Sequence, residues 1–212
     1  MLKRIFLVAV LLSFTLPLFA DELKSIKLPP PHLDSGKKLM QALKDRKSER
    51  SFSQKNLSMN VISNLLWAAD GINRQESGRR TAPSAVNWQA IDIYIATSDG
   101  LSLYEPKDHA MNPVLNKDIR ALTGKQAYAS EAPMDLIYVA NFSKMGGGST
   151  IEKVFYAAAD TGFISQNVYL YCASEGLATV VRGSIDKDIL AKAMKLSSYQ
   201  RIILAQTVGY PQ

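Results

Sequence analysis

The sequence predicts a single α+β domain in which helices cover the faces of a β-sheet. Short apolar or alternating runs recur between helical segments, and one pair of runs forms a hairpin. Strands and helices mixed in this way are typical of a sheet flanked by helices. One helical segment, residues 150–174, is much longer and more apolar than the others. With 212 residues, 47% of them hydrophobic, one domain of this kind can bury its own core.

The long helix should be the centre of the fold. Ser149 and Glu152 have the spacing of a capping box, and Gly176 suits the left-handed residue that ends a helix. The helix would be about 37 Å long at 1.5 Å per residue. Apolar side chains occur on nearly all its sides, as in helices buried inside a domain or between subunits. Cys172, the single cysteine, lies within it, so we expect an inert core residue and no internal disulfide.

The first twenty residues read as a signal peptide. Lys3 and Arg4 precede an apolar run that ends at Leu16, and Ala20 provides a cleavage site. The run is short for a stable membrane span. We therefore expect a signal peptide over 1–20, an extended lead-in over 21–35, one domain over 36–212, and export, most simply to a periplasm.

The remaining elements follow from periodicity and turn residues. We expect a polar, basic loop over 72–80 and helical pieces, broken at Pro113 and Gly124, over 106–128. The predicted helices cover 37–43, a segment from Ser58 to about Gly71, and 186–195; the predicted strands cover 90–97, 101–105, 134–141, 177–182 and 201–208.

Two short segments have residue types that suit ligand binding. Arg46, Lys47, Ser48 and Arg50 place three cations and a hydroxyl together, which is the donor set that phosphate prefers. The alternative is a solvated charged surface between two helices. The second segment, Pro83–Asn87, combines small residues with an amide that can both donate and accept hydrogen bonds. Its alternative is a helix N-cap at Ser84 before a strand.

These segments, with three others in the same order, resemble the FMN-dependent nitroreductase superfamily over nearly the whole chain after residue 20. Arg46–Arg50 is similar to its phosphate motif, and Ala82–Gln89 to a motif that lines the flavin, although Ala90 replaces the usual proline. The closest resemblance is to the branch that oxidises azoline rings in ribosomal peptides (the thiazole-forming, streptolysin-S-type dehydrogenases). The segments that resemble this branch are Gly100–His109, Asp160–Asn167 with Glu175–Leu177, and Val208–Pro211.

The resemblance implies an α+β homodimer with a mostly antiparallel central sheet, the long helix at the subunit interface, and two FMN sites between the subunits. It implies Arg46, Ser48 and Arg50 around the phosphate. Many members add a basic residue from a C-terminal extension that this sequence lacks, so two outcomes stay open: a lower phosphate affinity, or compensation by Lys47. It also implies that the flavin ring is contacted by Pro83, Ser84, Ala85 and Asn87, and is crossed by the backbone of Val181, Arg182 and Gly183. For the Arg182 side chain, three positions stay open: beside the ring, in the substrate cleft, or in solvent.

We therefore expect an exported FMN oxidoreductase that alternates hydride uptake, from NAD(P)H or another donor, with reduction of a small electron-poor acceptor. The alternatives are a dehydrogenase of a peptide heterocycle and a non-catalytic binding protein on the same scaffold. Because flavin supplies the chemistry, no acid/base pair is required, and the catalytic residues stay unassigned. His32 and His109 should be surface residues, and no Cys/His spacing suits a metal. Without Lys3 and Arg4 of the predicted signal peptide, the net charge falls from +6 to +4, which is too small and dispersed to indicate nucleic-acid binding.

Overall fold

The computed structural model describes residues 24–212, and the predicted signal peptide therefore lies outside the described residues. Its main sheet has seven strands in the order β1-β6-β5-β4-β7-β9-β8, and each neighbouring pair is antiparallel. The strands are β1 (Ile26–Lys27), β4 (Ile91–Thr97), β5 (Gly100–Glu105), β6 (Ala110–Leu115), β7 (Met134–Asn141), β8 (Ala178–Arg182) and β9 (Gln200–Gly209). A separate two-stranded sheet pairs β2 (Ile72–Arg74) with β3 (Arg79–Arg80).

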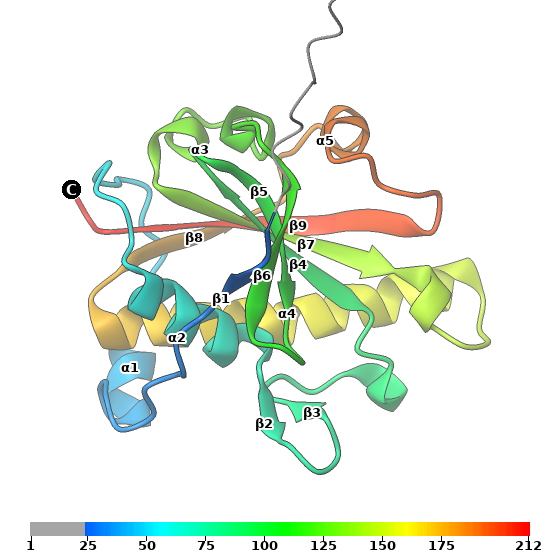
Figure 1. Ribbon diagram of the computed structural model, residues 1–212, viewed down its shortest axis with the longest axis horizontal. Coiled ribbons are helices and arrows are strands. Elements are labelled where there is room, and N and C mark those ends of the chain that lie inside the picture. The colour runs from blue at the N-terminus through cyan, green and yellow to red at the C-terminus, as the bar shows by residue number, and fades with distance from the viewer. Residues whose placement is uncertain (1–23) are drawn as a thin grey trace, which may run out of the picture.

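Helices pack on both faces of the main sheet (Figure 1). The long helix α4 (Thr150–Glu175) runs across one face beside α1 (Leu39–Asp45) and α2 (Met59–Asp70). On the other face, α5 (Lys187–Ala193) contributes Leu190 to a second apolar cluster. A short helix α3 (Tyr128–Glu131) and three 3₁₀ turns, Ala85–Asn87, Arg120–Leu122 and Phe142–Lys144, complete the elements. The α+β prediction is thus confirmed.

The local signals at the ends of α4 act as the sequence indicates. The Ser149 hydroxyl accepts from the Glu152 amide, and the Glu152 carboxylate accepts from the Ser149 amide, which satisfies two helix-terminal donors. Gly176 ends the helix in the left-handed conformation at φ 69°. Cys172 is fully buried and unpaired, and burial raises the pKa of its thiol well above the ordinary value.

Within a single chain, α4 is buried on one side only, so of the two expected settings, inside the domain or between subunits, the first accounts for one side of the helix. Ala157, Ile164 and Val168 face the core, whereas Ile151 and Phe155 are 82% and 67% exposed. The apolar residues on the second side therefore have no cover within residues 24–212. A pattern of apolar residues predicts burial, but it does not say whether the covering surface belongs to the same chain.

Two connecting segments are strands where the sequence predicted none. The predicted loop over 72–80 is the β2–β3 hairpin, and the predicted helical pieces over 106–128 contain β6. Pro113 lies inside β6 at an irregularity of the β5–β6 register, where Leu101 pairs with Leu115 and Ser102 with Pro113. A proline is accepted in a sheet at such a bulge because its missing N–H interrupts no regular ladder.

His109 connects three parts of the fold, so the expectation of a surface histidine was also wrong. The Ser63 hydroxyl donates to the Pro29 carbonyl at 2.6 Å and therefore accepts from His109 Nε2 at 2.7 Å. His109 Nδ1 is then left to accept from the Tyr104 hydroxyl at 3.0 Å. Burial lowers the pKa of His109, because it disfavours the charged ring. His32 is exposed, as expected.

Candidate functional site

The first predicted motif follows α1 as an extended segment beside the edge strand β8. The Glu49 amide donates to the Thr179 carbonyl at 3.0 Å, which holds the segment against the strand. Side chains alternate along an extended chain, so every second residue faces one side. Arg46 and Ser48 accordingly both contact Tyr169 of α4. The Arg46 guanidinium lies 5.4 Å from the tyrosine ring centre, and Ser48 Oγ lies 2.8 Å from Tyr169 Oη.

Tyr169 also links this motif to the segment Val181–Gly183, whose backbone is expected to cross the flavin ring. The Val181 amide donates to Tyr169 Oη at 2.9 Å, so a single hydroxyl contacts both Ser48 and the end of β8. Tyr169 was not among the site residues predicted from the sequence. In the sequence, the one feature that could have indicated Tyr169 is its phenol on a helix face otherwise made of apolar and small residues. Its partner on β8, the Val181 amide, is apparent only from the packing of α4 against that strand.

The cations of the first motif differ in what they contact. Lys47 forms an ion pair with Glu49 at 2.6 Å, which offsets part of its charge. Lys47 and Tyr169 line a cavity of about 550 Å³ between the segment and α4. Arg50 is exposed, and no ion pair involves it within the described chain. Arg46, Ser48 and Arg50 are therefore better placed than Lys47 to donate to a phosphate.

The second motif is a strained turn held by a carboxylate. Val86 and Asn87 have φ values of 51° and 58°, and Val86 is 79% exposed. A β-branched residue in the left-handed region costs about 1–3 kcal/mol, and such strain is concentrated at functional sites. The Ala85 amide donates to both oxygens of Asp160 on α4, at 3.1 and 3.2 Å. Burial raises the pKa of Asp160, and the hydrogen bond from Ala85 opposes that rise.

One chain does not bring the two motifs together at one end of α4. The first motif contacts Tyr169 and the second contacts Asp160, and these residues are separated by about 13 Å of helix. The first motif also lies by β8, whereas the second lies by the β2–β3 hairpin at the bottom of Figure 1.

The Arg182 side chain lies in none of the positions expected from the sequence. Its side chain is 1% exposed and forms an ion pair with Asp135, while Nη1 donates to the Thr123 carbonyl at 2.7 Å. All three positions considered for this side chain were therefore wrong, because it is buried inside the domain and binds Asp135 and Thr123 of the same chain. Burial raises the pKa of Asp135 to about 6, because the loss of hydration outweighs the attraction of Arg182 and the hydrogen bonds from Thr207 and Thr123. Val181 and Arg182 are the last residues of β8 and Gly183 follows them; the predicted contact of this backbone with the flavin stays a prediction.

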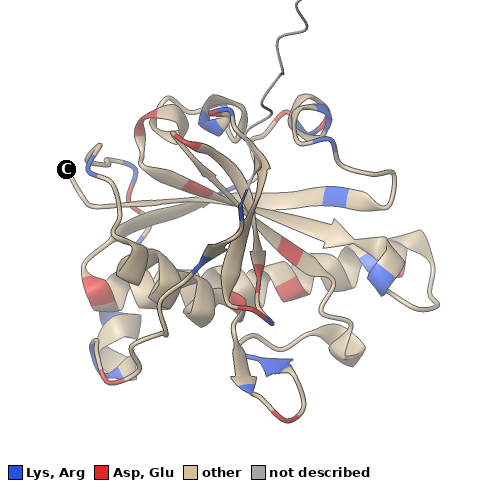
Figure 2. Cartoon of the chain, viewed as in Figure 1, with Lys and Arg blue, Asp and Glu red and all other residues tan. Residues whose placement is uncertain are grey.

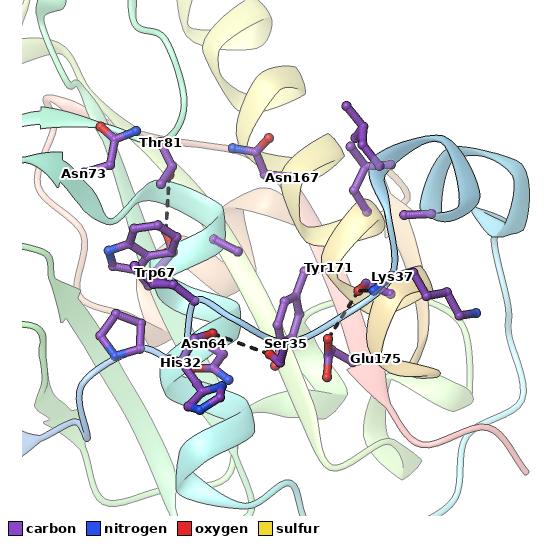
Figure 3. Close-up of a pocket in the computed structure, with 17 residues that line it drawn as sticks. His32, Ser35, Lys37, Asn64, Trp67, Asn73, Thr81, Asn167, Tyr171 and Glu175 are labelled. Atoms are coloured by element: carbon purple, nitrogen blue, oxygen red, sulfur yellow. Dashed lines mark hydrogen bonds between the residues drawn. The ribbon is translucent and has the colours of Figure 1, made fainter.

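A separate cavity of about 490 Å³ lies between the lead-in, α1, α2 and α4 (Figure 3). Its walls include Trp67 and Tyr171, and the lead-in closes one side through a hydrogen bond from the His32 amide to Asn64 at 2.8 Å. None of the predicted flavin residues lines it. Within residues 24–212, no group of three or more His, Cys, Asp or Glu side chains is placed to hold a metal ion. In the same residues, no helix has the length and apolar character of a membrane span.

Comparison with known proteins agrees with the fold. A protein from Ralstonia eutropha JMP134, solved as a nitroreductase, is 41% identical with a TM-score of 0.85, over 89% of this chain and 90% of that one. A Methanocaldococcus jannaschii protein classed as a nitroreductase is 29% identical over 177 residues, covering 79% of this chain and 89% of its own. The Escherichia coli microcin synthetase complex, solved with truncated pro-MccB17 bound, contains a chain of the same fold at 23% identity and a TM-score of 0.68, over 99% of this chain and 85% of that one.

The match to a family is equally broad. Residues 43–210 match the family described as Nitroreductase, a range that contains every residue predicted to contact the flavin. The chain therefore belongs to the nitroreductase family of oxidoreductases.

Proposed function

We propose that this protein is an exported, FMN-dependent oxidoreductase that passes hydride, by a ping-pong cycle, from a donor to a small electron-poor acceptor. The observation that carries the proposal is the meeting of Ser48, Tyr169 and Val181, which brings the phosphate-type motif and the end of β8 to one point. Bound FMN would supply the hydride chemistry, and the chain would supply binding and orientation. Family membership supports the oxidoreductase class.

The residues of the first motif fit a phosphate group. Arg46 is half-buried, with its guanidinium over the ring of Tyr169, and the Ser48 hydroxyl contacts the hydroxyl of the same tyrosine. Arg50 is exposed on the same short segment. Charge-assisted donors arranged in this way suit a terminal phosphate, which FMN has and FAD does not.

The residues of the second motif suit contact with the edge of a flavin ring that is bound mainly by the other subunit. Asn87 presents both a donor and an acceptor, and the strain at Val86 is the kind that a binding site retains. Since about 13 Å of α4 separates the contacts of the two motifs, we propose that Pro83, Ser84, Ala85 and Asn87 of one subunit complete the site formed by Arg46–Arg50 and Val181–Gly183 of the other.

A homodimer through α4 would cover the exposed apolar side of this helix. The exposed residues lie along one stripe that includes Ile151, Phe155 and Gly162, and Leu39 and Met40 of α1 are exposed as well. An obligate interface of this kind should exceed about 2,000 Å² in total. The alternative function, oxidation of a peptide heterocycle, has the support of the shared fold with the microcin synthetase chain, but at 23% identity this likeness concerns the fold alone.

The experiment is to purify residues 21–212 and identify the cofactor. We expect a yellow protein whose absorbance is bleached by dithionite, which releases FMN and no FAD, and which has the mass of a dimer by light scattering. In a second experiment, the bound flavin should be reduced by NADH, NADPH or an artificial donor and then reoxidised by a nitroaromatic acceptor. A colourless protein that takes up no FMN would favour the binding-protein alternative. Fractionation of cells that express the full chain tests export.

A further inference from the structure

The β2–β3 hairpin carries three arginines beside the second motif. Arg74, Arg79 and Arg80 line a pocket of about 440 Å³ together with Pro83, Ser84 and Asn87. Figure 2 shows the positive charge on the two strands of the hairpin and negative charge at its turn. The acidic residue of that turn, Glu76, is exposed and does not line the pocket. One side of the pocket is therefore formed by the arginines of the hairpin and the other by residues of the second motif, Pro83–Asn87.

Hydrogen bonds make the hairpin and the second motif one unit. Gln89 Nε2 donates to the Gly78 carbonyl at 3.0 Å and to Asn87 Oδ1 at 3.2 Å, so a single amide links the turn of the hairpin to the motif. Arg80 is held in place by an ion pair with Asp70, the last residue of α2, and its side chain is 14% exposed. The pocket is thus preorganised rather than formed by a loose loop.

Donors remain available in this pocket. Arg74 uses Nη2 to bind the Arg80 carbonyl at 2.6 Å and Nε to bind Asn73 at 3.0 Å, which fixes its plane and leaves Nη1. Arg79 is exposed and has neither a hydrogen bond nor an ion pair from its side chain within residues 24–212. Arg80 Nε is buried without a partner in the same residues. Guanidinium groups held in this way suit a carboxylate or a phosphate.

Nearby acidic groups offset the charge of Arg80 alone and leave the charges of Arg74 and Arg79. Asp70 is already paired with Arg80, and Asp160 is directed at the Ala85 amide on the α4 side of the motif. We propose that this arginine pocket binds the anionic group, a carboxylate or a phosphate, of the molecule that exchanges electrons at the adjacent flavin site. The inference rests on the proposed function, because contact between Pro83–Asn87 and the flavin ring is what makes the pocket a neighbour of the reaction.

The test compares pairs of ligands in which one member carries an additional anionic group. We would titrate 4-nitrobenzoate and its uncharged isostere 4-nitrobenzamide into the oxidised, flavin-loaded protein by calorimetry. Because NADPH and NADH reduce the bound flavin, the second arm compares their KM values for flavin reduction. The wild-type chain should prefer the charged ligand in at least one arm by about fivefold or more, since hydrogen bonds to charged groups are among the stronger ones. The nitrobenzoate arm identifies an acceptor carboxylate, and the NADPH arm identifies a donor phosphate.

The variant is Arg74→Gln/Arg79→Gln, and the matched control is Lys187→Gln/Lys192→Gln, which removes two exposed charges on the distant helix α5. The arginine variant should bring the preference to about one and the lysine control should preserve it. Arg79→Gln alone, which breaks no hydrogen bond within residues 24–212, serves if the double variant does not fold. The proposal is overturned if neither arm shows a charge preference, if the control loses it equally, or if the arginine variant weakens FMN itself more than tenfold, because the arginines would then belong to the cofactor site.

Failure of the proposed function gives a different result. If the protein binds no FMN, inorganic pyrophosphate is titrated into the flavin-free protein. Binding that disappears in the arginine variant supports the pocket as an anion site, whereas no binding by the wild-type chain removes both proposals.

Discussion

Arg182→Met should destabilise the fold by removing one partner of a buried ion pair. The Arg182 and Asp135 side chains are 1% and 0% exposed, so the substitution leaves a carboxylate in the interior with only the hydroxyls of Thr123 and Thr207 as donors. The Thr123 carbonyl loses its donor as well. Removing one member of such a pair costs about 3–5 kcal/mol. For a chain of this size, that corresponds to a fall in melting temperature of about 6–20 °C.

The loss should depend on pH. The folded-state pKa of Asp135, about 6, is above its unfolded value, so the folded state binds the proton more tightly. Stability from this group is therefore fully present at low pH and is lost as pH rises through the folded pKa. Without Arg182 the folded pKa moves further up, so the deficit of the variant should be larger at pH 8 than at pH 5.5.

The assay is urea unfolding at a fixed protein concentration, at both pH values, because dimerisation would otherwise change the midpoint. The double variant Asp135→Leu/Arg182→Met removes both charges and should recover more than half of the loss. A deficit below about 1 kcal/mol, or a double variant as unstable as the sum of the single ones, would refute the reasoning, since the pair would then not be a dry, mutually compensating contact.

Three further outcomes follow from the site. Arg46→Gln should weaken FMN binding by about 1.5–3 kcal/mol, the range for a hydrogen bond to a charged group; flavin fluorescence titration measures this, and an unchanged affinity would remove Arg46 from the phosphate site. Gly162→Leu should give a folded monomer by light scattering and circular dichroism, because a Cβ at this exposed position meets no atom within 4 Å in residues 24–212 and only a second subunit would be obstructed; a variant that stays dimeric would place the interface elsewhere. Asp160→Asn should gain stability relative to wild type as pH rises from about 4, since burial raises the folded pKa of Asp160 and stability is lost as that carboxyl ionises; parallel unfolding curves of the two proteins from pH 4 to 7 would contradict this.

The positions of the main helices and of most central strands could be read from the sequence because local rules determine them. The capping box at Ser149 and the glycine at position 176 fix both ends of α4 through backbone groups of the same segment. The alternation over 90–97 likewise predicts β4, in which Ile91, Ile93 and Ile95 are buried. The two short motifs were likewise noticed from residue types that suit phosphate and amide recognition, but their assignment to a flavin came from the family resemblance and stays a prediction.

Other features could be seen only in the tertiary structure, because they depend on contacts between segments far apart in the sequence. Pro113 is accepted in β6 because the partner strand β5 is irregular there, and no rule along the chain shows this. Arg182 is an arginine in a strand whose partners, Asp135 and Thr123, are 47 and 59 residues away, so its role could not be read from its neighbours. Packing between distant segments also determines that the contacts of the two motifs lie about 13 Å apart along α4. It likewise determines that the apolar side of this helix is exposed in a single chain. A sequence specifies which residues prefer burial or a charge partner, but only the packing of the folded chain shows which partner each one has.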